Sequence, residues 1–276
     1  MRIDAHQHFW QYSPAEYGWI SDEMEVLKSD HLPDRLAPLL AAAGLDGTVA
    51  VQARHAVAET EWLLELAVQN PFIKGVVGWV DLAGPELESQ LTRFASHPKF
   101  CGVRHVVQDE PDDRFMLRPD FLRGIEKLAA FDLVYDILIY PRHLPAACEL
   151  VQEFPEQPFV LDHIAKPLIK DRILAPWDEQ IKRLAIYENV TCKVSGMVTE
   201  ADWGGWRPAD FRAYLDVVLA AFGSERLMFG SDWPVCTLAG SYDQVVHLVA
   251  SYAEALSANE QADLWGRTAV RVYGLE

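Results

Sequence analysis

The sequence predicts one domain, residues 1–276, folded as a (β/α)8 barrel of the TIM type. Three observations lead to this prediction. Eight short apolar runs alternate with segments of helical periodicity, polar side chains gather where the runs end, and 276 residues suit a barrel of about 250. No break in composition and no low-complexity linker divides the chain, so a single domain accounts for it.

The eight runs are short, rich in β-branched residues and nearly all apolar. They span residues 2–6, 45–53, 73–82, 100–107, 133–140, 158–164, 189–195 and 226–232. Near-continuous apolarity in short runs is typical of parallel strands that are covered on both faces.

The intervening segments carry helix start and stop signals. Pro33 near the start and Gly44 just past the end delimit the first one. Similar patterns occupy 59–71, 84–98, 118–131, 142–154, 176–189 and 207–223, and the stretches 241–256 and 259–275 are expected as two closing helices. A doubly wound open sheet is the alternative, but no GxGxxG motif follows the first run. The long segments 9–32 and 197–208 are expected to cover the mouth of the barrel.

Composition excludes several classes of partner. The net charge is -17 and the pI about 4.9, which disfavours nucleic acid and anionic membrane surfaces. The four cysteines are far apart without CxxC spacing, and neither a signal segment nor an 18-residue apolar run is present. We therefore expect a cytoplasmic protein with reduced thiols and a small-molecule partner, whose oligomeric state the sequence leaves open.

Polar and ionisable side chains collect at the carboxyl ends of the runs, where a barrel of this kind forms its active site. They are His6, His8, Gln52, Arg54, His55, Trp79, Asp81, Arg104, His105, Asp136, Tyr140, Asp162, His163, Lys166, Lys193, Ser195, Ser231, Asp232 and Trp233. Taken singly, several have ordinary interpretations: His6 and His8 as structural imidazoles bonded to Asp4, Asp232 as a turn starter, Lys193 as a solvent-facing lysine. Their combination at one end of the barrel favours a working site.

Three motifs carry a family resemblance. MRIDAHQHFW, DHIAKP and FGSDWP resemble signatures of the amidohydrolase superfamily, in its amidohydrolase-2 lactonase branch. AHQHFW, YGWI (17–20), GTVAVQAR (47–54) and GVVGWVDL (75–82) are most similar to L-fuconolactonase-like and L-rhamnonolactonase-like sugar lactone hydrolases. The resemblance covers nearly the whole chain. It implies a (β/α)8 fold and hydrolysis of a cyclic ester, such as a sugar lactone of L-fucose catabolism.

Two departures from the wider superfamily bear on metal binding. The fourth run offers Arg104 and His105 but no lysine, and the fifth offers Asp136 but no histidine, so a two-metal centre lacks its bridging ligand. His6, His8, His163 and Asp232 could hold one divalent cation such as zinc or manganese. Because the branch resembled includes members that work without metal, we expect none to be required.

The same four residues form the predicted catalytic set. Asp232 is the candidate general base for water, and His6, His8 and His163 are the candidate donors to the carbonyl oxygen. Asp4 and Asp162 would favour imidazolium forms of these histidines.

The predicted substrate contacts combine polar groups for hydroxyls with flat apolar walls. They are Trp10, Arg54, Arg104, His105, Asp136, Tyr140, Lys166 and Trp233, with Gln52 and Trp79 as further candidates. A dicarboxylate lactone would instead need convergent arginines, for which Arg54, Arg104 and Arg142 are available. A metal-dependent decarboxylase and a non-catalytic carbohydrate-binding barrel are the remaining alternatives.

Overall fold

The computed structural model describes residues 1–276 and confirms the barrel. Its strands form one parallel sheet in chain order: β1 (Ile3–Gln7), β2 (Gly47–Val51), β3 (Ile73–Gly78), β4 (Phe100–Val106), β5 (Val134–Leu138), β6 (Phe159–Leu161), β7 (Val190–Val194) and β8 (Leu227–Phe229). A parallel bridge between Gln7 and Trp233 joins the last strand to the first, so the barrel is nearly closed.

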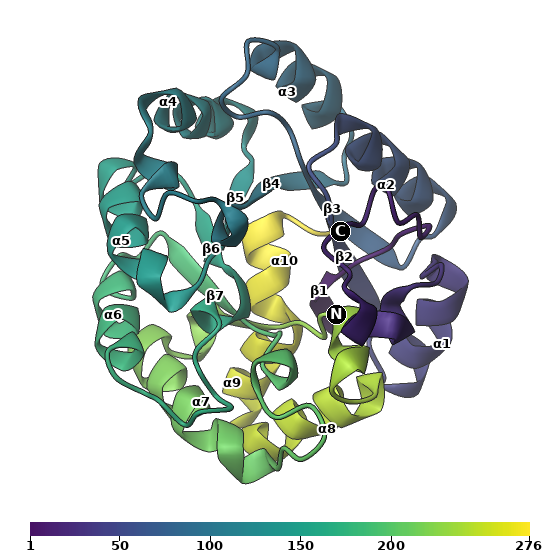
Figure 1. Cartoon of the computed structure of the whole chain (residues 1–276), viewed down its shortest axis with the longest axis vertical. Coiled ribbons are helices and arrows are strands. Elements are labelled where there is room, and N and C mark those ends of the chain that lie inside the picture. The colour runs from purple at the N-terminus through teal and green to yellow at the C-terminus, as the bar shows by residue number, and fades with distance from the viewer.

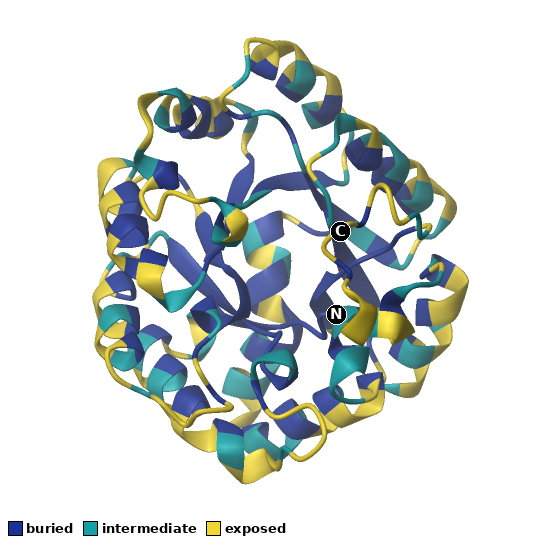
Figure 2. Ribbon diagram, in the orientation of Figure 1, coloured by how far each residue is buried: buried dark blue, intermediate teal, exposed yellow.

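Helices surround the strands as an outer ring (Figure 1). They are α1 (Pro33–Ala42), α2 (Val57–Gln69), α3 (Leu87–Ala95), α4 (Pro119–Leu128), α5 (Leu144–Glu153), α6 (Trp177–Leu184), α7 (Pro208–Phe222) and α8 (Tyr242–Ala253). The chain ends in α9 (Ala258–Ala262) and α10 (Thr268–Tyr273), and α10 lies in the centre of the view. Figure 2 shows the strands buried and the outer helix faces exposed. No helix is long and apolar enough to cross a membrane.

The expected closing helix 259–275 is interrupted. A π-helical turn, Asp263–Arg267, separates α9 from α10. A Cβ on Gly266 would lie 2.1 Å from the Met1 carbonyl oxygen, so the chain start approaches too closely for any side chain there.

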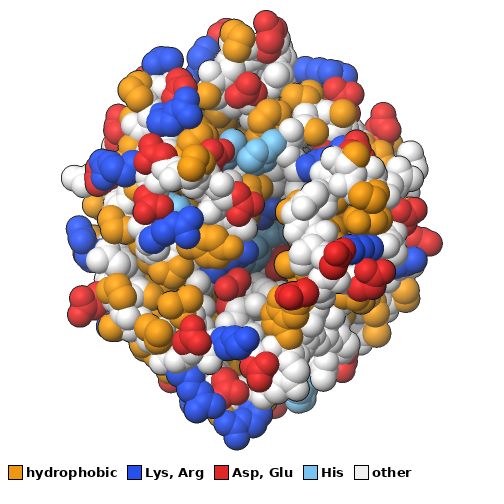
Figure 3. Space-filling model, in the orientation of Figure 1, with side chains coloured by type: hydrophobic (Ala, Val, Ile, Leu, Met, Phe, Trp, Pro, Cys, Tyr) orange, Lys and Arg blue, Asp and Glu red, His pale blue; other side chains and the backbone are white.

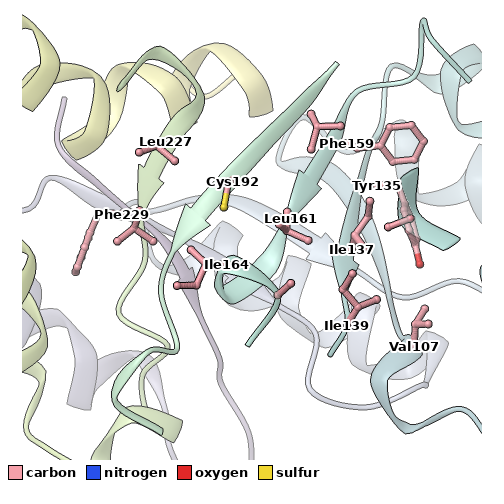
Figure 4. Packing of buried hydrophobic residues seen from close by; sticks show 14 of the residues in the cluster. Val107, Tyr135, Ile137, Ile139, Phe159, Leu161, Ile164, Cys192, Leu227 and Phe229 are labelled. Atoms are coloured by element: carbon pink, nitrogen blue, oxygen red, sulfur yellow. The ribbon is translucent and has the colours of Figure 1, made fainter. Parts of the chain in front are cut away.

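Apolar side chains fill the barrel on both sides of the strands. Outside, Leu161, Cys192 and Leu227 pack towards the helices (Figure 4). Inside, Ile3 and Val49 join other strand residues against Tyr273 and its neighbours in α10. The C-terminal helix therefore closes the amino end of the barrel and leaves the carboxyl end open.

The first strand does not keep the alternation that its sequence suggests. Its pairing with β2 shifts register between Asp4 and Gln7. Asp4 accepts hydrogen bonds from the Ser231 N–H (2.8 Å) and the Tyr242 hydroxyl (3.0 Å), on the α8 side. His6 instead contacts groups inside the barrel. The expectation that Asp4 accompanies the histidines is therefore wrong, because the irregularity turns His6 away from it.

Candidate active site

A cavity of about 790 Å³ opens at the carboxyl ends of the strands. Figure 3 shows this hollow near the middle of the face, with histidine and charged side chains around it. Segment 9–32 contributes Glu16, Trp19 and Met24 to its wall, and segment 197–208 contributes Glu200 and Trp203. The two long loops therefore do form part of the mouth.

Four predicted residues meet at the floor of this cavity. His8 Nε2 lies 3.3 Å from Asp232 Oδ1, and His6 Nε2 lies 3.2 Å from His8 Nε2 and 3.8 Å from that oxygen. His163 Nε2 lies 3.9 Å from the same oxygen. His8, His163 and Asp232 line the cavity, whereas His6 is fully buried behind them. His6 is therefore corrected from a substrate-facing donor to a buried neighbour of the site.

The seam between the first and last strands sets the spacing of this cluster. The Asp232 N–H donates to the His6 carbonyl (2.8 Å), and the His8 N–H donates to the Trp233 carbonyl (2.7 Å). Asp232 adopts a left-handed conformation with φ of 58°, which is uncommon outside glycine and typical of functional sites.

His163 stands on a left-handed turn after β6. His163, Ile164, Ala165 and Lys166 have φ values of 53°, 48°, 59° and 50°. For a β-branched residue such as Ile164 this is costly, about 1–2 kcal/mol. The Trp177 indole N–H donates to the Ile164 carbonyl (2.8 Å), and Ile164 is buried in the apolar layer beside β6 and β7 (Figure 4). Packing therefore holds a strained turn that aims His163 at Asp232.

Each histidine has a different partner on its second ring nitrogen. His8 Nδ1 lies 2.8 Å from the Val51 carbonyl, which only accepts, so this nitrogen carries the hydrogen. His163 Nδ1 lies 2.8 Å from the Ser195 hydroxyl. His6 Nδ1 lies 3.1 Å from the Lys193 ammonium. These tautomers are assigned from the partners.

Burial disfavours the charged forms of His6 and His163. It lowers the pKa of His163 to about 4 and that of His6 well below its usual value, despite the attraction of Asp162. For His6 and His163, the expected imidazolium forms are therefore corrected to neutral rings. For Asp232, burial alone would raise the pKa, but the adjoining His163 and His8 hold it below its ordinary value, so the carboxylate is ionised.

A buried ionic network lies under the cluster. The Lys193 ammonium contacts Asp136 Oδ2 at 2.5 Å and Asp162 Oδ1 at 3.0 Å. Arg104 Nη1 contacts Asp162 Oδ2 at 3.0 Å and lies 3.4 Å from His6 Nε2. Lys193 is fully buried, so its interpretation as a solvent-facing lysine is wrong.

The cluster agrees only in part with a resident cation. His6, His8 and Asp232 offer nitrogen and oxygen atoms close to the spacing of about 3.4 Å that tetrahedral zinc requires. However, the ammonium of Lys193 and the guanidinium of Arg104 both contact the His6 ring. Two positive groups at one ligand oppose a bound divalent cation, so the charge of the surroundings does not match the spacing of the ligand atoms.

Four of the predicted substrate contacts line the cavity. They are Arg54, Arg104, Tyr140 and Lys166. Lys166 also lies 5.6 Å from the centre of the Tyr140 ring and 3.9 Å from Glu200 Oε1.

The other four do not line it, and their predicted contact with substrate is corrected. Asp136 is held in the core by Lys193 and the Tyr273 hydroxyl. Trp10 packs with Tyr17 and His31, and Trp233 with Phe9 and His31. His105 binds Glu110 at 2.7 Å and receives the Trp79 indole N–H. Each of these four side chains contacts neighbouring protein residues and does not line the cavity.

Sequence reasoning placed Lys193 and Ser195 at a strand end without their contacts to His6 and His163, and it missed the cavity residues Glu110 and Glu200. Lys193 and Ser195 carried a usable signal, because polar side chains two apart in an apolar strand share one face. The two glutamates lie in loops, where spacing carries no comparable signal.

Known proteins resemble this chain over its full length. The family profile described as Amidohydrolase matches residues 3–275. An L-fucono-1,5-lactonase of Burkholderia multivorans is 48% identical and aligns over 100% of this chain and 96% of its own. The L-fucono-1,5-lactonase of Burkholderia ambifaria is 40% identical over 87% of this chain and 83% of its own.

Solved structures agree with this assignment. An amidohydrolase of Burkholderia multivorans, crystallised once with HEPES and once with zinc, is 47% identical, with a TM-score of 0.96 over 100% of both chains. A probable 2-pyrone-4,6-dicarboxylic acid hydrolase of Acinetobacter baumannii, 15% identical with a TM-score of 0.78 over 99% of both chains, shares the fold. The match over residues 3–275 and the two close relatives show that this chain belongs to the amidohydrolase family.

Proposed function

We propose that this protein hydrolyses a neutral sugar lactone, L-fucono-1,5-lactone or a similar aldonolactone, to the free sugar acid. Two L-fucono-1,5-lactonases at 48% and 40% identity support the reaction class. The observation that carries the substrate class is the charge of the cavity wall. Its carboxylates are Glu16, Asp109, Glu110, Glu200 and Asp232, against the cations Arg54, Arg104 and Lys166.

The cavity cations are largely neutralised by protein partners. Arg54 is paired with Glu16, and Arg104 with Asp162. The third arginine considered for a dicarboxylate, Arg142, binds Asp113 and does not line the cavity. A dianionic lactone would meet more negative than positive charge, whereas a neutral ring finds many acceptors for its hydroxyls. The wall therefore favours an aldonolactone over a dicarboxylate lactone.

Asp232 and His163 divide the chemistry in this proposal. The Asp232 carboxylate takes a proton from water as the water oxygen attacks the lactone carbonyl carbon. Ser195 donates to His163 Nδ1, which leaves a hydrogen on Nε2 to meet the charge that grows on the carbonyl oxygen. When the ring C–O bond breaks, the proton on Asp232 passes to the ring oxygen, and the acid product leaves.

A panel of lactones tests this function. We expect rapid acid release from L-fucono-1,5-lactone and related aldonolactones, and slow or no release from a dicarboxylate lactone at equal concentration. The comparison is made against spontaneous hydrolysis in a pH-stat. A preference for the dicarboxylate, or carbon dioxide release from an aromatic acid, would contradict the proposal; the latter would favour a decarboxylase.

A further inference from the structure

Two charged side chains of the cavity wall form no hydrogen bond with the rest of the protein. Lys166 and Glu200 both line the cavity, and their side chains are only 16% and 21% exposed. The Lys166 ammonium lies 3.9 Å from Glu200 Oε1, which is too far for a hydrogen bond, and 5.6 Å from the centre of the Tyr140 ring. Polar groups that are largely removed from water normally have hydrogen-bond partners, so this pair is open to a ligand.

The other cations of the cavity wall already bind carboxylates of the protein. Arg54 forms an ion pair with Glu16, and Arg104 Nη1 donates to Asp162 Oδ2 at 3.0 Å. Lys166 is therefore the cavity cation whose hydrogens are free for a ligand. An ammonium only donates and a carboxylate only accepts, so a ligand that satisfies both members of the pair must both accept and donate. Hydroxyl groups do both.

Both members of the pair stand on backbone that contacts His163. Lys166 ends the left-handed turn that begins at His163, and its N–H donates to the His163 carbonyl at 2.8 Å. Glu200 follows shortly after Gly196, where a Cβ would lie 2.5 Å from His163 Nδ1. The Lys170 N–H donates to the Glu200 carbonyl at 2.9 Å and joins the two segments. The pair is therefore fixed beside the histidine that is proposed to meet the carbonyl oxygen.

We propose that Lys166 and Glu200 are specificity-determining residues that bind neighbouring ring hydroxyls of the lactone. Lys166 donates to one hydroxyl oxygen, and Glu200 accepts from the next hydroxyl. Neighbouring hydroxyls of a sugar ring lie about one hydrogen-bond length apart, which suits two head groups 3.9 Å apart. The Tyr140 ring offers a flat surface beside the ammonium. The inference rests on the proposed function for the class of ligand.

A double variant tests the pair without changing the net charge of the cavity. Lys166→Met alone would leave Glu200 as a largely buried carboxylate without its neighbouring cation, so its effects would include those of the charge. Lys166→Met with Glu200→Gln removes one charge of each sign and nearly keeps the length of both side chains. Arg114→Met with Glu149→Gln is the matched control, because it removes an exposed ion pair that does not line the cavity.

The first readout compares L-fucono-1,5-lactone, which carries ring hydroxyls, with δ-valerolactone, a lactone of the same ring size that has none. We expect the double variant to lose about 10- to 100-fold more kcat/KM on the hydroxylated lactone than on δ-valerolactone, because hydrogen bonds to charged groups are lost. The control should keep the wild-type ratio between the two substrates. Equal losses on both lactones would overturn the proposal, because a purely structural role would affect every substrate alike.

The second readout needs no turnover. In the cyclic ether that corresponds to L-fucono-1,5-lactone, a methylene group replaces the carbonyl, so the hydroxyls remain but nothing can be hydrolysed. Calorimetric titration should show that this ether binds the wild type about 10- to 100-fold more tightly than the double variant. Either single variant gives the same comparison if the double variant does not fold.

This titration separates the pair from the reaction. Equal affinity of the ether for the wild type and the variant, or binding to neither, would overturn the role of Lys166 and Glu200 even in an active lactonase. The expected difference in affinity without any lactone hydrolysis would support that role and contradict only the proposed function.

Discussion

Three imidazoles within one cluster take different roles because their outer nitrogens meet different groups. The Nδ1 atom of His8 meets the Val51 carbonyl, that of His6 meets the Lys193 ammonium, and that of His163 meets the Ser195 hydroxyl. The HxH motif alone does not distinguish these roles, because they come from residues on other strands.

Asp232→Asn tests the proposed base. The amide keeps the shape of the side chain but cannot take a proton from water, so kcat should fall by about 10²- to 10⁴-fold with little change in KM. Initial rates of acid release give both constants. Asp109→Asn, at an exposed carboxylate of the same cavity wall, is the control. Turnover of the Asp232 variant close to that of the control would remove Asp232 as the base.

At the scale of the elements, the left-handed turn 163–166 is the segment most dependent on its packing. Trp177→Phe removes the only side-chain hydrogen bond found to the Ile164 carbonyl while keeping an aromatic ring. We expect a loss of about 1–3 kcal/mol in the free energy of unfolding, from the buried carbonyl left unpaired, and a lower kcat. Denaturant titration and initial rates measure the two effects. Unchanged kcat would show that the turn does not position His163.

Strands and helices were predictable because their apolar patterns are local. All eight expected strands are present, and every strand end lies within four residues of its predicted position. The irregularity in β1 was not predictable, because it depends on pairing with β2 and gives the Asp4 and His6 side chains different partners within one five-residue strand. The close approach of Met1 to Gly266, within the turn that separates α9 from α10, likewise involves the other end of the chain.

At the scale of the whole molecule, the barrel explains which site residues could be found. Carboxyl ends of parallel strands converge, so His8, His163 and Asp232 were identifiable before any coordinates. Contacts such as Lys193 with His6, 187 positions apart, follow from the closed geometry and have no sequence signal. The predicted substrate contacts of Trp10 and Trp233 were wrong for the same reason, since packing between distant segments decides whether an aromatic ring faces the cavity.

The stability of the whole protein should depend on pH through buried histidines such as His31. Burial, with Arg35 nearby, lowers the pKa of His31 from 6.5 to about 4. Between these values the unfolded chain binds a proton that the folded chain does not, so stability falls as the pH drops from 6.5 to 4. His31→Gln should reduce this slope, by at most about 1.4 kcal/mol per pH unit. Identical pH profiles of unfolding for the wild type and the His31 variant would contradict a lowered His31 pKa in the folded protein.

Hydrolysis of L-fucono-1,5-lactone by chelator-treated protein tests the central claim most directly, because it asks whether side chains alone perform the reaction. We predict that the treated enzyme keeps most of its rate above spontaneous hydrolysis. Activity that disappears on chelation and returns only with zinc or manganese would contradict the account.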